Sequence, residues 1–237
     1  MIWIRSSVYA ATFLAWTIVC ALVGLPALLT SSGAFFVIHI WARGIMILAR
    51  WIADIRYEIQ GLEHLPRGQC IVAFQHQSAF ETFLLILLAD RPTFVLKKEV
   101  GLIPFIGWYA ARAGMIYVDR GAGASAMRKV IRGAKLALAR NSQIMISPEG
   151  ARTTPGTEKK YLPGIAALYA HCDAPVIPMA LNSGYYWGKT RLLKIPGKIV
   201  FRFLPAIPDN LDKKTFLMTL KQNIEAAASN LPKPSLL

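Results

Sequence analysis

The stretch IVAFQHQSAFET, residues 71–82, decides how this chain is organised. It opens with a short apolar run typical of a buried strand, and His76 follows directly after that run. Glu81 comes five residues later, at the head of a second apolar run. On one continuous helix, positions five residues apart point about 140° away from each other. The stretch therefore predicts a strand, a turn that holds His76, and a helix whose first turn holds Glu81.

This arrangement suits a histidine that acts as a base and is held in one tautomer by a carboxylate. The same residues also fit a capping box, in which Ser78 is the N-cap and Glu81 occupies position N3. In that interpretation Glu81 stabilises a helix terminus and takes no part in chemistry. The stretch alone leaves both interpretations open.

The composition indicates a membrane and an anionic partner. Of the 237 residues 54% are hydrophobic, and the mean hydropathy is +0.41, which is high for a soluble protein. The net charge of +14 favours nucleic acid, acidic lipid headgroups or phosphorylated substrates. Cys20, Cys70 and Cys172 lie far apart and show no metal-ligand spacing, as is typical of a reducing compartment.

The N-terminal region carries no formal charge from Ser6 to Ala42. This is longer than the roughly 20 residues that one spanning helix needs, and Pro26 with residues 30–33 divides it into two apolar segments, 8–29 and 34–52. Basic residues flank only the outer ends, so that the positive-inside rule places both ends in the cytosol. We expect a membrane-embedded helical hairpin over residues 1–54, dipping into one leaflet or crossing twice, and a second domain over residues 55–237.

Beyond residue 54, short apolar runs alternate with helical stretches. This pattern predicts an α/β fold with a central mixed, largely parallel sheet flanked by helices. The expected strands are residues 70–74, 93–96, 115–118, 143–146, 176–181 and 199–203. The expected helices are residues 79–89, 122–139, 164–171 and 213–230. Ligands of such folds bind beyond the carboxyl ends of the strands, which is where His76 falls.

A second candidate site is the loop SPEGARTTPG, residues 147–156, which follows the fourth expected strand. Glu149 can accept a hydrogen bond from an alcohol, and Arg152 can clamp a phosphate through two parallel hydrogen bonds. A surface turn with a local Glu149–Arg152 ion pair explains the same residues without a function. The loop by itself does not separate these possibilities.

Further basic residues follow other strands. Lys97 and Arg120 come after the second and third expected strands, so that both can face the same crevice as His76. The apolar run 102–109 between them is rich in glycine and proline, and can pack in the core, line a fatty-chain groove or rest on lipid. A stripe of Arg128, Arg132 and Lys135 fits a solvated helix face or a docking site for acidic lipid or an acidic carrier protein.

Taken in order, these motifs resemble those of the glycerolipid acyltransferase family, in particular its bacterial lysophosphatidate acyltransferases. The resemblance covers about residues 56–208. The blocks similar to the family's four motifs are His76 to Glu81, Lys97 to Arg120, residues 147–153 (SPEGART, where the family has FPEGTRS) and residues 176–180 (VIPMA).

Three positions depart from the family pattern. Glu81 stands in place of the usual aspartate, Ala151 in place of a threonine and Ser147 in place of a phenylalanine. The longer side chain of Glu81 moves its carboxylate by about 1.5 Å, which the turn has to accommodate.

The resemblance implies a membrane-bound enzyme of phospholipid biosynthesis that moves a fatty acyl group from acyl-coenzyme A or acyl carrier protein to the sn-2 hydroxyl of lysophosphatidate, making phosphatidate. It implies that His76 takes the hydroxyl proton and Glu81 orients the imidazole. The residues it assigns to the acceptor are Glu149, Gly150 and Arg152, with Lys97 and Arg120 as weaker candidates. No metal or cofactor is implied. Anionic lipids are the expected partners, at the bacterial inner membrane with the active site facing the cytosol.

Other functions remain to be weighed. The acceptor can instead be another lysolipid or glycerol 3-phosphate. A basic, membrane-tethered binding protein is a different class, but the basic residues are not interleaved with aromatic ones and no nucleic-acid motif is present. A hydrolase built on His76 lacks the Gly-x-Ser-x-Gly elbow.

Overall fold

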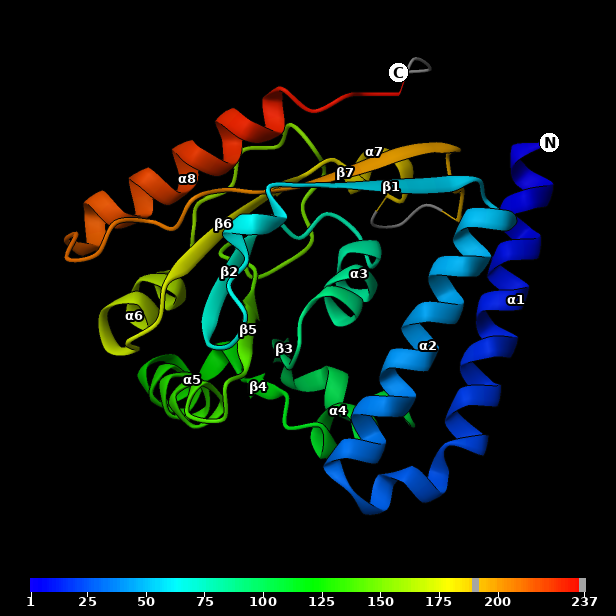
Figure 1. Ribbon diagram of the computed structural model, residues 1–237, viewed down its shortest axis with the longest axis horizontal. Coiled ribbons are helices and arrows are strands. Elements are labelled where there is room, and N and C mark those ends of the chain that lie inside the picture. The colour runs from blue at the N-terminus through cyan, green and yellow to red at the C-terminus, as the bar shows by residue number, and fades with distance from the viewer. Residues whose placement is uncertain (189–191, 235–237) are drawn as a thin grey trace.

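The computed structural model describes residues 1–188 and 192–234, except for the side chain of Arg120. Within these residues, seven strands form one sheet in the order β1-β7-β6-β2-β5-β3-β4 (Figure 1). The strands are β1 (Ile55–Gln60), β2 (Cys70–Phe74), β3 (Pro92–Lys97), β4 (Ile116–Val118), β5 (Gln143–Ile146), β6 (Val176–Leu181) and β7 (Gly197–Phe203). The helices are α1 (Ile2–Val23), α2 (Ser31–Trp51), α3 (Phe80–Leu88), α4 (Ile106–Arg112), α5 (Gly123–Leu138), α6 (Pro163–His171), α7 (Ser183–Tyr186) and α8 (Lys213–Ser229).

The sheet is mixed and largely parallel, as predicted. Strands β6, β2, β5, β3 and β4 run in one direction, whereas β7 is antiparallel to β6 and carries β1 parallel to itself at the edge. All six expected strands are present within two residues of their predicted bounds, and the four expected helices of the α/β part within one.

The sequence prediction missed one strand and two short helices. β1 reads IRYEIQ, and its charged residues are typical of an edge strand rather than of the apolar runs that marked the other strands. α4 begins in the glycine- and proline-rich run 102–109, which was not among the expected helices. It is only seven residues long, and it buries Tyr109 while Trp108 remains half exposed. α7 is a single turn after β6.

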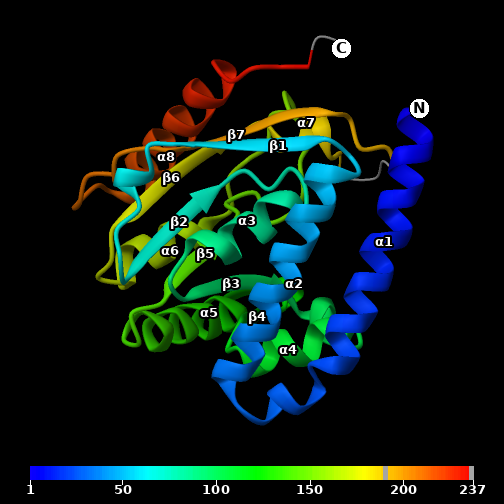
Figure 2. The ribbon, with the colours of Figure 1, turned by 45° about the vertical axis from the view of Figure 1, so that its right-hand side comes forward.

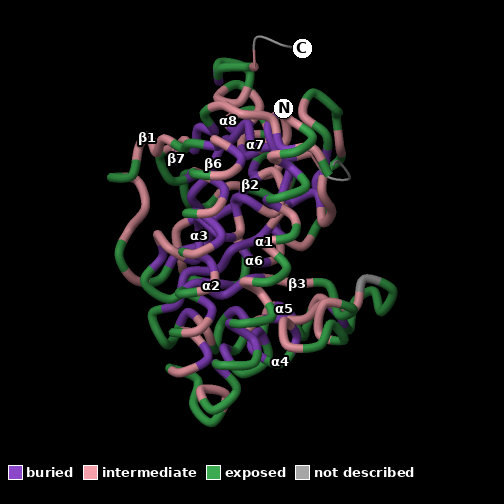
Figure 3. The backbone as a smooth tube through the Cα atoms, turned by 90° about the vertical axis from the view of Figure 1, so that its right-hand side faces the viewer, coloured by how far each residue is buried: buried purple, intermediate pink, exposed green. Residues whose placement is uncertain are grey.

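Helices cover both faces of the sheet. Cys70, Val72 and Phe74 of β2 share a hydrophobic core with α1 to α4, whereas Ile71 and Ala73 share another with α5, α6 and α8. This alternation follows from the two-residue period of a strand. Figure 2 shows α2 and α3 on one side of the sheet and α5, α6 and α8 on the other. In Figure 3 the buried backbone concentrates in the sheet and in the helices packed on it.

The two N-terminal helices form the expected hairpin. α1 and α2 run antiparallel and are joined by a 3-10 turn, Leu25–Leu29 (Figure 1). Trp16 Nε1 donates to the carbonyl of Trp41, and Gly44 allows the Trp16 ring to lie against the backbone of α2. Both helices are long and apolar enough to cross a membrane by length and composition.

One face of α2 packs on the α/β part of the chain. Its buried residues recur at helical spacing and belong to the same hydrophobic core as β2 and α3: Ala34, Ile38, Ala42, Ile45, Met46 and Ala49. Contact of the hairpin with a membrane, and a domain boundary at residue 54, remain predictions.

Candidate active site

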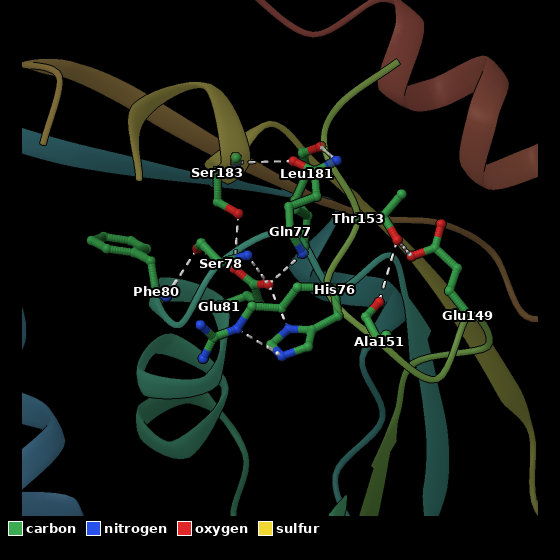
Figure 4. Close-up of polar contacts among 12 residues, drawn as sticks. His76, Gln77, Ser78, Phe80, Glu81, Glu149, Ala151, Thr153, Leu181 and Ser183 are labelled. Atoms are coloured by element: carbon green, nitrogen blue, oxygen red, sulfur yellow. Dashed lines mark hydrogen bonds and ion pairs between the residues drawn. The ribbon is translucent and has the colours of Figure 1, made fainter. Parts of the chain in front are cut away.

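The site lies at the carboxyl ends of three neighbouring parallel strands, β6, β2 and β5 (Figure 4). β2 leads into the turn that holds His76, β5 into the loop of residues 147–162, and β6 into Ser183. Because the strands are adjacent in the sheet, residues more than 100 positions apart meet at this edge, such as Glu81 and Ser183. This is the edge at which α/β folds bind ligands.

His76 and Glu81 form a hydrogen-bonded pair. α3 begins at Phe80 and so places Glu81 in its first turn, as the sequence predicted. Nδ1 of His76 lies 2.8 Å from Oε1 of Glu81. The His76 side chain is one quarter exposed, whereas that of Glu81 is completely buried. The carboxylate therefore holds the ring from inside the protein while the opposite edge of the ring faces outward.

Glu81 accepts four further hydrogen bonds. Oε1 accepts from the backbone N–H groups of Gln77 at 2.8 Å and Ser78 at 2.7 Å, and Oε2 accepts from the hydroxyls of Ser78 at 2.6 Å and Ser183 at 2.8 Å. Burial opposes ionisation of Glu81, but the hydrogen bonds from His76 and Ser78 outweigh it and hold the pKa of Glu81 below its usual value. Glu81 is thus an ionised and immobile partner for His76.

The capping-box interpretation is correct only in part. The N-cap residue of α3 is Ala79 rather than Ser78, and the Ser78 hydroxyl accepts a hydrogen bond from the backbone N–H of Phe80 at 3.0 Å. Glu81 does accept from backbone N–H groups before the helix, as an acidic residue in a first turn can. It satisfies these groups and holds His76 with the same carboxylate.

Arg152 faces the outer nitrogen of His76. Its Nε lies 3.4 Å from Nε2 of His76, a long hydrogen bond. Since arginine can only donate, Nε2 is the acceptor and the ring proton lies on Nδ1, directed at Glu81. This is the tautomer that a general base requires, because Nε2 carries a lone pair rather than the ring proton.

The loop of residues 147–162 is fastened to the turn that holds His76. The backbone N–H of Thr153 donates to the His76 carbonyl at 2.7 Å, and the Thr153 hydroxyl donates to Oε2 of Glu149 at 2.6 Å. Gly150 has a φ of 68°, a left-handed conformation that glycine adopts without strain. These contacts fix the position of Arg152 relative to the imidazole.

Glu149 points into the loop rather than out of it. It is 6% exposed, and its Oε1 accepts no hydrogen bond from the described residues. Burial raises the pKa of Glu149. The predicted alternative of a local Glu149–Arg152 ion pair is absent from the described part of the chain, where Arg152 turns to His76 instead. A direct contact between Glu149 and the acceptor remains a prediction.

The two weaker candidates lie at the ends of β3 and β4. Lys97 is half exposed, and its Nζ lies 3.2 Å from Oε1 of Glu99. Arg120 begins a 3-10 turn after β4, and its side chain lies outside the described residues. Of the predicted site residues, the structure therefore brings five together at one edge of the sheet: His76, Glu81, Gly150, Arg152 and the buried Glu149. Substrate roles for Lys97 and Arg120 remain predictions.

Sequence reasoning did not single out Ser183 or Gln77. Nε2 of Gln77 donates to the carbonyl of Leu181 at 3.2 Å, and its Oε1 accepts from the backbone N–H of Gly184 at 3.0 Å. These bonds bring α7 to the turn of His76, so that Ser183 reaches Glu81. The only sequence signal was the polar pair that follows the expected strand 176–181.

The fold and the site define an α/β protein with a histidine–carboxylate pair at the ligand-binding edge of its sheet, an arrangement suited to activating a hydroxyl group. The acyltransferase family model matches residues 56–182, more than half of the chain. The chain belongs to this acyltransferase family, as the sequence motifs predicted.

Relatives of known name agree with this assignment. The chain is 34% identical over 194 residues to a 1-acyl-sn-glycerol-3-phosphate acyltransferase of Pseudomonas aeruginosa, covering 82% of this chain and 76% of the relative. It is 27% identical over 169 residues to 1-acyl-sn-glycerol-3-phosphate acyltransferase alpha of Mus musculus, covering 70% and 59%. The crystal structure of the 1-acyl-sn-glycerophosphate acyltransferase PlsC from Thermotoga maritima has the same fold, with a TM-score of 0.77, 18% identity and 97% coverage of both chains.

Proposed function

We propose that this enzyme transfers a fatty acyl group from an acyl thioester to the sn-2 hydroxyl of lysophosphatidate and so makes phosphatidate for phospholipid biosynthesis. The observation that carries the proposal is the placement of His76, with the buried Glu81 on Nδ1 and the Arg152 guanidinium beside Nε2. A phosphate bound by Arg152 would bring a nearby hydroxyl of the same molecule to the base. The relatives named for this acceptor support the choice of lysophosphatidate.

The proton transfer uses residues of this chain. Nε2 of His76 takes the proton of the sn-2 hydroxyl while the hydroxyl oxygen attacks the carbonyl carbon of the thioester. Glu81 stabilises the imidazolium that forms, since its carboxylate is ionised and cannot move away. The C–S bond then breaks, and the imidazolium returns the proton to the leaving thiolate. Binding the acceptor next to the base converts an encounter of two molecules into a reaction within one complex. These steps use only the acyl thioester, the acceptor and side chains of this chain, so the proposed mechanism invokes no metal or cofactor.

The proposal places the enzyme at the bacterial inner membrane, with the active site facing the cytosol. Each helix contains an apolar window of 18 residues. Only 22% of this window is buried in α1 and 33% in α2, so both helices present apolar surface that lipid can cover. Leu102 and Trp108 add exposed apolar side chains near α4. The net charge of +14 favours anionic lipids. An acceptor embedded in the membrane would then enter from the side of the hairpin.

The test is thiol release from an acyl thioester by the purified protein, with and without lysophosphatidate, together with identification of the lipid product. We expect acceptor-dependent release and phosphatidate as the product. His76→Ala should lower kcat by about 100-fold or more, as the loss of a general base does. The matched control is His171→Ala, because His171 is exposed at the end of α6 and should not affect the rate.

Two results would count against the proposal. Thiol release that does not respond to His76→Ala would exclude His76 as the base. Faster transfer to glycerol 3-phosphate or to another lysolipid than to lysophosphatidate would assign a different acceptor to the same chemistry.

A further inference from the structure

A groove lies beside the active-site loop, on the side of the sheet opposite the hairpin. Its volume is about 520 Å³, and it runs between residues 158–161 and the first half of α8. The lining residues are Glu158, Lys159, Lys160, Tyr161, Lys214, Leu217, Met218 and Lys221. Four of these eight residues are lysines, which makes the groove a strongly basic feature of the described surface.

Three of the lysines are not held by an ion pair within the described residues. Lys221 is paired with Glu158. By contrast, Lys159, Lys160 and Lys214 form no ion pair with any carboxylate in the described residues. Between them Leu217 and Met218 present apolar surface, and Met218 is 52% exposed. Cations around an apolar patch are suited to a ligand that combines phosphates with a flat, uncharged ring.

The groove and the active-site loop share a wall. Tyr161 lines the groove and is 6% exposed. Burial raises the pKa of Tyr161, and the negative charge of the nearby Glu149 raises it further. The backbone N–H of Leu162 donates to the carbonyl of Pro148 at 2.7 Å and closes the loop on itself. Lys221 of α8 pairs with Glu158, which follows Thr153 in the same loop. The Tyr161 end of the groove therefore adjoins the active-site loop. The Lys214 end lies toward the amino ends of the strands, because residues 204–207 run back along β6 to Val176 before α8 begins.

We propose that this groove binds the nucleotide phosphates of coenzyme A when acyl-coenzyme A is the donor. The inference rests on the proposed function, because it needs an acyl thioester as the co-substrate. In coenzyme A the phosphates are separated from the sulfur by the pantetheine arm, so a phosphate site has to lie away from His76 and still open toward it. The unpaired lysines match the phosphates in charge, and Leu217 with Met218 provides an apolar surface for the adenine ring.

The position of the groove also separates the two substrates. α8 packs on the sheet face opposite α1 to α4, through Phe216, Leu220 and Ile224. A water-soluble donor can therefore approach from this side while a lipid acceptor approaches from the hairpin. An acidic carrier protein is the competing donor, but it needs a wide docking surface rather than a groove of this size.

The first experiment compares two donors that carry the same acyl chain, acyl-coenzyme A and acyl-pantetheine, which lacks the nucleotide and every phosphate. Lys159→Glu, Lys160→Glu and Lys214→Glu should each raise KM for acyl-coenzyme A about tenfold. KM for acyl-pantetheine should stay unchanged. Lys129→Glu is the matched control, because Lys129 is an exposed lysine of α5 that lies neither in the groove nor in the stripe of Arg128, Arg132 and Lys135.

The second experiment measures binding without catalysis. Calorimetric titration of the full-length protein with coenzyme A should show binding that weakens about tenfold in Lys214→Glu and weakens with added salt. Titration with 3′-dephospho-coenzyme A should show weaker binding to the wild type and a smaller effect of the substitution.

The results of these two experiments distinguish a failure of the groove inference from a failure of the proposed function. Equal effects of the groove variants on both donors, or no effect on either, would overturn the inference and leave the acyltransferase reaction standing. Transfer from an acyl carrier protein thioester but not from acyl-coenzyme A would also overturn it. Absence of transfer from every donor would reject the proposed function, and the titration with coenzyme A would still decide whether the groove binds the nucleotide.

Discussion

Nε of Arg152 lies 3.4 Å from Nε2 of His76, although the two residues are 76 positions apart in the sequence. The contact joins the turn after β2 to the loop after β5, and those two strands pair directly in the sheet. In this structure the guanidinium therefore occupies the region next to the base, where the proposed acceptor has to place its hydroxyl. A bound phosphate would attract the guanidinium and leave Nε2 open to that hydroxyl.

Substitution of Arg152 should weaken acceptor binding. Arg152→Ala removes charge-assisted hydrogen bonds to a phosphate, and we expect KM for lysophosphatidate to rise about 10- to 100-fold. Arg152→Lys keeps the charge but loses the planar fork, so its KM should lie between those of the alanine variant and the wild type. The KM of the acyl donor serves as the internal control. A fall in kcat with no change in the acceptor KM would show that Arg152 acts on His76 alone.

Removal of the Glu81 carboxylate should affect the rate strongly. Glu81→Gln places an uncharged amide opposite Nδ1 of His76, and kcat should fall about 100- to 1,000-fold because the imidazolium loses its ionised partner. The measurement is kcat at saturating acceptor and donor, with circular dichroism to establish that the variant is folded. A variant with nearly normal kcat would show that Glu81 serves only to cap the start of α3.

Ser183 should have a smaller, positioning effect. Ser183→Ala removes one of the hydrogen bonds to Oε2 of Glu81, at a cost of about 1–2 kcal/mol in the free energy of unfolding. We expect kcat to fall less than tenfold and the pH profile of kcat to shift, because Glu81 is then held less firmly. Ser229→Ala is the control, since the Ser229 hydroxyl is exposed and bonds only within its own helix. An unchanged pH profile would reduce Ser183 to a structural role.

Glu149 should make stability depend on pH in the opposite sense from Glu81. Burial raises the pKa of Glu149 from its usual value of 4.5, so its contribution to stability is present below 4.5 and is lost as the pH rises through the raised value. Glu149→Gln removes this loss, and we expect it to stabilise the fold by about 1 kcal/mol at neutral pH. Thermal unfolding in detergent at several pH values measures the difference, which should disappear in acid. A difference that is the same at every pH would contradict this explanation.

The lowered pKa of Glu81 has the reverse consequence. Its contribution to stability is fully present above the usual value of 4.5 and is lost as the pH falls through the lowered folded value. The wild type should therefore lose stability in acid more steeply than Glu81→Gln does. Parallel acid unfolding curves for the two proteins would contradict this expectation.

The hairpin should depend on the absence of a side chain at Gly44. A Cβ atom there would overlap the indole ring of Trp16 at Nε1, so Gly44→Val has to push α1 away from α2. We expect a loss of about 1–3 kcal/mol, measured as a lower unfolding temperature in detergent. Ile47→Val is the control, because Ile47 lies on the same helix and is half exposed. Equal stability of the glycine variant and the wild type would show that the hairpin can repack.

Much of the fold could be predicted because the sequence carries local signals for it. For β2, β5 and β6 the predicted first and last residues are those of the structure. Each strand is an apolar run that is buried on both faces and is followed by polar residues. β1 carries no such signal. It is an edge strand with exposed Arg56 and Tyr57, and only its pairing with β7 identifies it.

The sequence by itself determined the α/β class and the hairpin. It also allowed His76 to pair with Glu81, because a strand end followed by a helix start can bring residues five positions apart together. The tertiary structure alone decided that Ser183 reaches Glu81, that Arg152 turns to His76 rather than to Glu149, and that residues 158–161 form a basic groove with α8. The physical reason is that these contacts depend on which strands are neighbours in the sheet. That order is set by packing of the whole chain and leaves no local pattern in the sequence.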